Sequence, residues 1–382
     1  MSKTMLYHWP APLPEKLDSG SKLHLVRMLE GFREIGYEVE VVAGNGAQRG
    51  ELASKIKREV AAGRRFDFVF SESLSIPTLL TERHHLPTHP GVDFGLLGWL
   101  RSRGTPVGLF YGDVYWRFPY FTALRPGVER VLVDLFYRYD VWQYRRVLDH
   151  LFVPAVGMAA LLPGGWPAER VSALLPGCTV ADLPSGRRAA GEGGLRIFYV
   201  GGSLPPLYNL APLFEATRSL EGVSVQVCCR AEEWATARAA YGGEVGEGVQ
   251  VVHISGPGLA ELYAEADLFS MVFEPNSYRA VTVPVKLFEC LGYATPVVTM
   301  VGAGGPAQTE TARLIAEYGL GWVVGSVEEL RALLERLRDD PAPIAAQRAH
   351  LAELRPRHTW AARAQYVADT LTGSRAPELR SS

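Results

Sequence analysis

The feature that most constrains the fold is a repeated succession of short apolar runs and longer amphipathic stretches. The apolar run TMLYHW (residues 4–9) precedes KLHLVRMLEGFREIG (22–36), whose apolar residues recur at helical spacing, and YEVEVV (37–42) then reads as a strand. FDFVF (66–70) and TPVGLF (105–110) continue the pattern. Strand, helix and strand in this order predict a parallel sheet with right-handed crossovers.

The same succession starts again after a segment of different character. Residues 178–194 lose their periodicity and gain glycine, proline and arginine, as a linker does. Strand-like runs return with LRIFYV (195–200) and alternate with helical stretches from there on. We therefore predict an α/β protein of two doubly wound domains, residues 1–180 and 195–357, joined by a linker at 181–194. Because ligands of open parallel sheets bind at the carboxyl ends of the strands, two such domains are expected to face a common cleft.

Charge and cysteine content narrow the class of protein. The formal net charge of −2 provides no overall field that would attract nucleic acid or a membrane. The cysteines fit no zinc or disulfide spacing, so we expect buried, reduced thiols and a cytoplasmic location. The N-terminus has no apolar signal region, and no apolar run reaches the ~18 residues of a membrane span. The four cysteines are Cys178, Cys228, Cys229 and Cys290.

The stretch TVPVKLFECLGYATPVV (282–298) carries a charged pair in a special position. Lys286 and Glu289 lie one helical turn apart and so share a face. Pro284 is favoured in a first helical turn, which places both charges at a helix N-terminus, a natural anion site. There a lysine can hold phosphate and a carboxylate can accept ribose hydroxyls. The alternative is a solvated salt bridge that contributes little.

Two further features of the second domain suit a phosphate ligand. In YVGGS, Gly201 and Gly202 follow a strand and let the backbone approach a ligand, while Ser203 can donate a hydrogen bond. A plain turn is the alternative, since the full dinucleotide spacing is missing. Arg230 ends the run VQVCCR and suits a diphosphate, or else pairs with Glu232 or Glu233 at the surface.

Together these segments resemble a known family. PVKLFECLGYATPVV is similar to the P-x-K-x-x-E and G-x-P-V-V segments of GT-B glycosyltransferases of the family 4 type. SGSKLHLVRMLEGFREIGYEVEVV, IFYVGG, GLAELYAEADLFSMVFEP and GLGWVV resemble the family in the same order. The resemblance implies two Rossmann-like domains, with helix 358–373 packing back on the first. It also implies that Glu289 binds the ribose, while Lys286 and backbone groups at Thr282 and Val283 face the diphosphate.

The sequence departs from this family at the sugar. Many members carry a second glutamate, and the corresponding position here is Val281. Glu274 or a backbone group would have to take over that contact. His253, at the end of a strand, is a candidate base contact or else a packed histidine.

The first domain offers candidates for the acceptor. Asp113 follows a strand in GLFYGDVYWRFPYF, where related enzymes often have a His-Asp pair; Tyr111 and Gly112 stand in place of the histidine. Asp113 could orient a hydroxyl, with aromatics stacking on sugar or prenyl groups, or it could cap a helix inside a core. Gly20, in the loop Asp18–Ser19–Gly20, would let a diphosphate approach, though a plain turn is the alternative. The neighbouring aromatics are Tyr111, Tyr115, Trp116, Phe118, Tyr120 and Phe121.

The predicted function is transfer of a sugar from a nucleotide-sugar to an acceptor hydroxyl, with retention implied by the resemblance and without cofactor or metal. His84, His85 and His89 have no ligand partners at metal spacing. The acceptor could be a glycan, a lipid-linked molecule or a small molecule. Arginines and aromatics in residues 115–146 allow peripheral contact at the inner face of a membrane. The alternatives are a nucleotide-sugar epimerase of the same architecture and a non-catalytic nucleotide- or sugar-binding protein.

Overall fold

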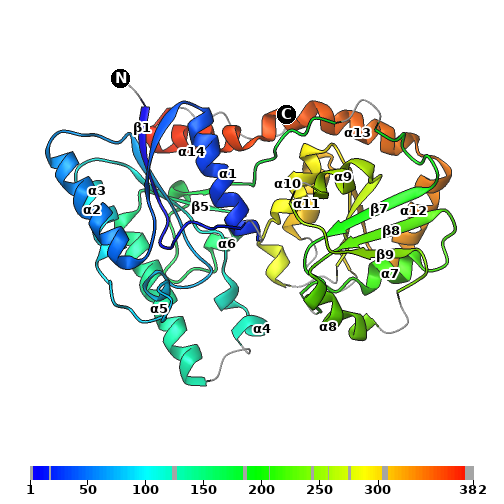
Figure 1. Cartoon of the computed structure of the whole chain (residues 1–382), viewed down its shortest axis with the longest axis horizontal. Helices are drawn as coiled ribbons and strands as arrows, with labels where there is room; N and C mark the ends of the chain where they lie inside the picture. The colour runs from blue at the N-terminus through cyan, green and yellow to red at the C-terminus, as the bar shows by residue number, and fades with distance from the viewer. Residues whose placement is uncertain are drawn as a thin grey trace. The chain divides into compact units, whose positions relative to one another are not determined.

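The protein consists of two compact units in a computed structural model. The first unit is Met1–Gly177 with Trp360–Arg380, and the second is Cys178–Thr359 with Ser381–Ser382. Each is a parallel sheet flanked by helices (Figure 1). The residues that the structure describes are 3–16, 19–122, 127–183, 187–205, 207–241, 245–256, 258–273, 277–302 and 309–374.

The sheet of the first unit has the order β2-β1-β3-β4-β5-β6 over the described residues, and its strands pair in parallel. The predicted succession of strands and helices is confirmed. Chain order reverses between β1 and β3, because β2 lies on one side of β1 and the later strands lie on the other. The strands are β1 (Lys3–His8), β2 (Tyr37–Val42), β3 (Phe68–Glu72), β4 (Val107–Phe110), β5 (His150–Val153) and β6 (Val171–Ala173).

Aromatic side chains fill the core between this sheet and its first helix. The ring of Phe32 packs against Tyr7, Phe68 and Phe70, with centroids 5.4 to 6.1 Å apart. Such tilted and edge-on pairs add stability beyond the burial of area. The helices are α1 (Gly20–Glu34), α2 (Gly46–Ala61), α3 (Val92–Arg101), α4 (Pro119–Thr122), α5 (Gly127–Val147), α6 (Val156–Ala159) and α14 (Trp360–Thr372), with 3₁₀ helices η1 (Thr78–Leu80), η2 (Tyr115–Arg117) and η3 (Ala168–Arg170).

Helix α14, at the far end of the sequence, belongs to the first unit and packs along α1 (Figure 1). The close approach depends on Gly31, since a Cβ there would lie 2.7 Å from the carbonyl oxygen of Trp360. Arg363 of α14 is fully buried and donates to the carbonyl of Pro176 at 3.1 Å. A helix that begins 187 residues after the last strand of this sheet thus completes its cover.

The sheet of the second unit has the order β12-β11-β10-β7-β8-β9 over the described residues, again parallel throughout. Its chain order reverses between β7 and β10. The second doubly wound sheet is therefore confirmed. The strands are β7 (Leu195–Val200), β8 (Val223–Cys228), β9 (Val249–Val252), β10 (Leu268–Met271), β11 (Val297–Met300) and β12 (Gly321–Val324). The helices are α7 (Ala211–Thr217), α8 (Ala231–Tyr241), α9 (Gly258–Glu265), α10 (Val285–Gly292), α11 (Glu310–Tyr318), α12 (Val327–Asp339) and α13 (Ala342–Leu354), with η4 (Ser277–Ala280) and η5 (Arg355–His358).

The described part of the expected linker is anchored to this second unit. Asp267 is fully buried and accepts hydrogen bonds from Arg188, from Arg348 of α13 at 2.9 Å, and from the amide of Arg196 at 3.0 Å. Arg187 donates to the carbonyls of Ala264 and Tyr293, each at 2.9 Å. Residues 187–194 therefore pack as part of the domain rather than as a free tether.

Candidate functional site

The second unit presents its functional candidates where the chain order of its sheet reverses. In doubly wound sheets ligands bind outside the carboxyl ends of the strands at this point. Here those ends belong to β7 and β10. Gly201 and Gly202 follow β7, and Phe273 lies two residues beyond β10.

Lys286, in the first turn of α10, reaches this edge of the sheet. Its Nζ donates to the carbonyl of Val200, the last residue of β7, at 2.8 Å. The same ammonium lies 5.0 Å from the ring centroid of Tyr199, 5.4 Å from that of Tyr208 and 5.8 Å from that of Phe273. These aromatic faces stabilise a cation in a half-buried place.

The two glycines of YVGGS make room for these side chains. Gly201 has φ +141°, and a Cβ on it would lie 2.2 Å from Nζ of Lys286. A Cβ on Gly202 would lie 2.5 Å from the ring of Tyr208. Packing of Lys286 and Tyr208 is therefore sufficient to explain why glycines stand at these two positions. Their contact with a phosphate stays a prediction.

Arg279, in η4, is a second cation beside Lys286 and was missed by sequence reasoning. Its guanidinium lies 4.0 Å from the centroid of Phe273 and donates to the carbonyl of Leu207 at 2.7 Å. Burial, and then the like charge of Arg279, lower the pKa of Lys286 to about 8. Two adjacent cations at a switch point form an arrangement that an anionic ligand would stabilise. In the sequence, the signal that could have identified Arg279 is the presence of an arginine between the strand β10 and the helix α10.

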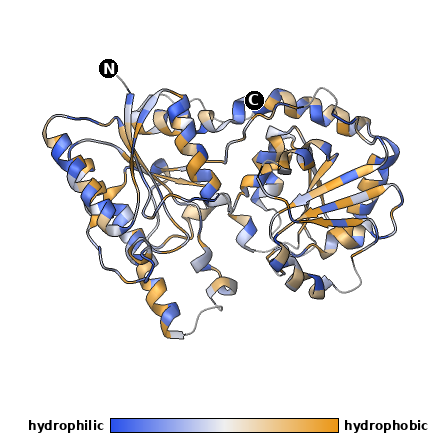
Figure 2. Cartoon of the chain, in the orientation of Figure 1, coloured by the Kyte–Doolittle hydropathy of each residue, from blue (hydrophilic) through white to orange (hydrophobic). Residues whose placement is uncertain are grey.

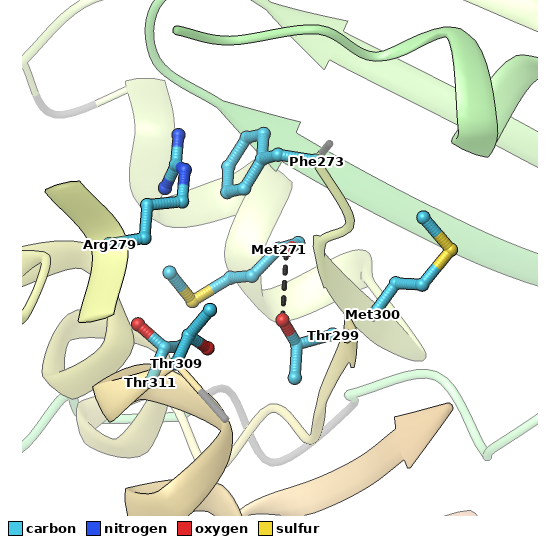
Figure 3. Close-up of a pocket in the computed structure, with 7 residues that line it drawn as sticks. All are labelled: Met271, Phe273, Arg279, Thr299, Met300, Thr309 and Thr311. Carbon is cyan, nitrogen blue, oxygen red and sulfur yellow. Dashed lines mark hydrogen bonds between the residues drawn. The ribbon is translucent and has the colours of Figure 1, made fainter. Parts of the chain in front are cut away.

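A small pocket opens beside Arg279, between β10, β11 and the start of α11 (Figure 3). Thr309 caps α11 by accepting from the amide of Ala312, and Thr299 donates to the carbonyl of Met271 at 3.0 Å. The pocket therefore combines a cation, hydroxyl groups and thioethers. Its lining is Met271, Phe273, Arg279, Thr299, Met300, Thr309 and Thr311.

Ser203 and Arg230 are both tied to Glu233. The amide of the fully buried Ser203 donates to Glu233 at 2.6 Å. Arg230, with 65% of its side chain exposed, lies 3.6 Å from the other oxygen of the same carboxylate. The ion pair weighed as the alternative to a diphosphate contact is thus present, and Arg230 as a donor ligand stays a prediction.

The remaining donor candidates of this unit lie around α10 and after β9. Glu289 is half-buried one turn beyond Lys286, and its charge helps to raise the pKa of the buried Tyr263, after burial itself. Thr282 donates to the carbonyl of Tyr278 at 3.2 Å, and Val283 is buried. His253 is exposed, with Nδ1 2.8 Å from the carbonyl oxygen of Cys229.

For the remaining predicted positions, Glu274 and the loop before α1, the structure shows little that bears on ligand binding. Glu274, the substitute proposed for a sugar contact, lies outside the described residues, as does Asp18. Gly20 is exposed and is the first residue of α1, where Ser19 makes no side-chain cap.

Asp113 of the first unit lies just beyond the carboxyl end of β4. Its Oδ2 accepts from the hydroxyl of Ser75 at 3.0 Å, and its Oδ1 accepts from the amide of Tyr115 at 2.7 Å. Burial raises the pKa of Asp113 to about 7. The carboxyl therefore both shapes the turn into η2, close to the capping role weighed above, and exchanges a proton near neutral pH.

A buried polar network marks the switch point of the first sheet, and sequence reasoning did not assemble it. Glu72, at the end of β3, accepts from the hydroxyl of Tyr7 and lies 3.0 Å from Nδ1 of His24. His8, at the end of β1, bridges Ser71 and Asp93 at 2.8 and 2.9 Å. Isolated histidines 16 residues apart give no sequence signal that they share one edge of a sheet.

No three His, Cys, Asp or Glu side chains of the described residues are grouped as a metal site. Within the same part of the chain, no helix is long and apolar enough to cross a membrane. The four cysteines, all among the described residues, are buried and form no disulfide.

The comparisons with known proteins agree with this architecture. Residues 211–369 match a family model described as glycosyl transferase-like. No curated protein matches the sequence. The chain resembles the structure of Anabaena Alr3699/HepE in complex with UDP and glucose, with TM-score 0.62, 13% identity, and coverage of 97% of this chain and 100% of that one.

Two further structures share the fold. An alpha-glucosyltransferase in complex with UDP and a 13-mer DNA containing a HMU base has TM-score 0.60 and 11% identity, covering 97% of this chain and all of that one. A mutant Thermobaculum terrenum O-GlcNAc transferase has TM-score 0.55 and 16% identity, covering 98% of this chain and 68% of that one. The chain thus has the GT-B fold of these glycosyltransferase structures, and its residues 211–369 match a glycosyl transferase-like domain.

Proposed function

We propose that the protein transfers a sugar from a UDP-sugar to an acceptor hydroxyl, without a metal ion. The observation that carries this proposal is the pair of cations Lys286 and Arg279 at the switch point of the second sheet. UDP is favoured because HepE has been solved with UDP, with UDP-glucose, and with UDP and glucose, and it has the same fold.

The physical task of such an enzyme is to stabilise a departing diphosphate. As the bond between the anomeric carbon and the β-phosphate oxygen breaks, negative charge grows on that oxygen. Lys286 and Arg279 can meet it with fixed positive charge, which stabilises a transition state because the cations are already in place. Side-chain cations can thereby fill the role that a metal ion has in other transferases.

We assign acceptor contacts to Asp113 in the first unit. Its carboxyl would orient the attacking hydroxyl, whose oxygen forms the new bond to the anomeric carbon. With retention of configuration, which the resemblance to the family 4 type implies, attack and departure share one face of the sugar. The released proton then passes to the departing diphosphate.

The test is release of UDP and the melting temperature with a panel of UDP-sugars and other nucleotide-sugars. We expect UDP to raise the melting temperature and Lys286→Met to reduce that shift strongly. Glu289→Ala should weaken UDP binding by ~2 kcal/mol if the carboxylate holds the ribose. Lys55→Met is the matched control, because Lys55 is half-exposed and pairs with Glu40 in the first unit.

Asp113→Asn should lower kcat by roughly 100-fold or more while leaving UDP binding unchanged. A melting temperature unaffected by every nucleoside diphosphate would sink the proposal. So would Lys286→Met binding UDP as well as the wild type does.

A further inference from the structure

Helix α5 has two apolar faces, and only one of them belongs to a core. Tyr137, Val141, Tyr144 and Val147 are buried against the first unit. On the opposite face, five large apolar side chains are between 51% and 77% exposed. We call these five residues the outer stripe: Val128, Val131, Leu132, Leu135 and Trp142.

The outer stripe is a continuous surface rather than scattered residues. Val128 is three and four residues from Val131 and Leu132, these are four and three residues from Leu135, and Trp142 follows Leu135 by seven, so the five lie along one side of the helix. The stripe runs over about 21 Å, given a rise of 1.5 Å per residue. Figure 2 shows hydrophobic residues in orange along α5, interspersed with hydrophilic ones in blue. A surface helix of a monomer normally exposes polar residues on this side, so a concentrated apolar face indicates a partner.

The charges beside the stripe indicate what kind of partner fits. Arg138 and Arg145 each follow a stripe residue by three positions, which places both on the same flank. Arg146 lies in line with the stripe, its guanidinium 4.6 Å from the ring centroid of Trp142. Of the acidic residues on the helix, Glu129 is exposed but lies about a third of a turn away from the stripe, Asp134 pairs with Arg138 at 2.6 Å, and Asp140 is buried. The surface along the stripe is therefore apolar, and Arg145 and Arg146 make its C-terminal end basic.

This combination favours an anionic lipid surface over a second copy of the chain. If α5 paired with its copy about a two-fold axis running along the helix, the same arginines would meet one another, and like charges repel. A bilayer with anionic headgroups instead accepts apolar side chains at the acyl boundary and phosphates beside the arginines. Tryptophan with an arginine over its ring also suits that boundary, where one side is apolar and the other wet.

We propose that α5 docks the first unit on an anionic membrane, with the outer stripe in the acyl boundary and Arg145 and Arg146 among the headgroup phosphates. This proposal does not depend on the reaction that the protein catalyses. It makes a prediction about binding to lipid in the absence of any sugar donor.

The experiment is co-sedimentation of the full chain with phosphatidylcholine vesicles that contain or lack phosphatidylglycerol. We expect binding to the anionic vesicles, weakened by high salt, and a loss of roughly tenfold or more in Leu132→Ser/Leu135→Ser. Leu86→Ser/Val323→Ser is the matched control, since it also removes two exposed apolar side chains, 58% and 38% exposed, from other surfaces. This control should bind as the wild type does.

Melting temperatures of all variants show whether they fold. If Leu132→Ser/Leu135→Ser is destabilised, the proposal is tested with Arg145→Glu/Arg146→Glu instead. This variant should abolish binding to anionic vesicles because it reverses the charge beside the stripe. Failure of the wild type to bind anionic vesicles overturns the proposal, and so does binding that the stripe and charge variants retain. Concentration-dependent dimerisation of the wild type that the stripe variant loses would assign the stripe to a second copy of the chain.

Discussion

Lys286 combines a structural contact with a charge that is unusually easy to remove. Its ammonium is bound to a strand carbonyl and surrounded by aromatic rings, and its pKa is lowered to about 8 by burial and by Arg279. The charge is thus present at neutral pH and lost in mildly alkaline solution. An ordinary lysine would keep it to about pH 10.

We therefore expect affinity for UDP to fall as pH rises through 8, by roughly three- to tenfold between pH 7 and pH 9. The phosphates are already ionised over this range, so the loss reports the lysine. Titration calorimetry at several pH values measures it. Lys286→Arg should remove the pH dependence while keeping positive charge, and a fall of the same size in Lys286→Met would contradict the assignment.

Asp140 gives a residue-scale prediction in the first unit. This carboxyl on α5 is buried and accepts from the amide of Thr78 at 2.6 Å, and burial raises its pKa to about 7. Its pKa is raised on folding, so the folded state holds a proton that the unfolded state releases near pH 4. Asp140 therefore lowers the free energy of unfolding progressively from about pH 4 to pH 7, by a few kcal/mol in all.

Asp140→Asn removes that penalty. We expect the variant to be more stable than the wild type at pH 8, with the gain shrinking towards pH 4, as measured by urea unfolding across this range. Asp134→Asn, on the same helix but in an exposed ion pair, is the control and should change stability by under about 1 kcal/mol. Equal stabilities of Asp140→Asn and wild type at pH 8 would show that the buried carboxyl carries no such cost.

Among the elements, α1 and α14 depend on one glycine. Gly31→Ala would add a methyl group 2.7 Å from the carbonyl oxygen of Trp360, and a backbone atom cannot move away cheaply. The gain in helix propensity of up to about 1 kcal/mol is outweighed, so we expect a net loss of roughly 1–3 kcal/mol. Gly95→Ala in α3 is the matched control: nothing lies within 4 Å of its Cβ, so it should stabilise.

Thermal unfolding of the two variants measures the difference. A Gly31→Ala protein at least as stable as the wild type would mean that α14 shifts along α1 without cost.

How far sequence predicts each element depends on whether its signal is local. Strands such as β3 and β11 are fully buried, so the sequence itself shows an apolar run. Helix α2 is harder, because it buries few side chains and is held by a capping box at Asn45 and by Arg49, which binds Asp93 at 2.8 Å. The position of Lys286 on a helix was readable, but its contact with Val200 joins residues 86 apart. Arg279 was missed because a loop arginine carries no periodicity.

At the scale of the whole molecule, the candidate site residues are distributed over both units. The candidate donor contacts around Lys286 and Arg279 lie in the second unit, whereas Asp113 and the outer stripe lie in the first. A ligand that binds only folded protein stabilises the part that holds it, by about 2.7 kcal/mol when present at 100 times its Kd.

Calorimetry should therefore resolve which unit binds UDP. Asp267→Ala leaves Arg188 and Arg348 without their shared carboxylate and should destabilise the second unit by about 3–5 kcal/mol. Gly31→Ala destabilises the first unit instead. We expect UDP to raise the midpoint temperature of the unfolding transition that Asp267→Ala lowers. UDP should not change the midpoint temperature of the transition that Gly31→Ala lowers. The opposite pairing would move the donor site to the first unit, and with it the roles argued for Lys286 and Arg279. A single unfolding transition that shifts with Asp267→Ala, with Gly31→Ala and with UDP would instead mean that the two units unfold cooperatively. In that case, whether UDP still raises the melting temperature of Lys286→Met would show whether the donor site is in the second unit.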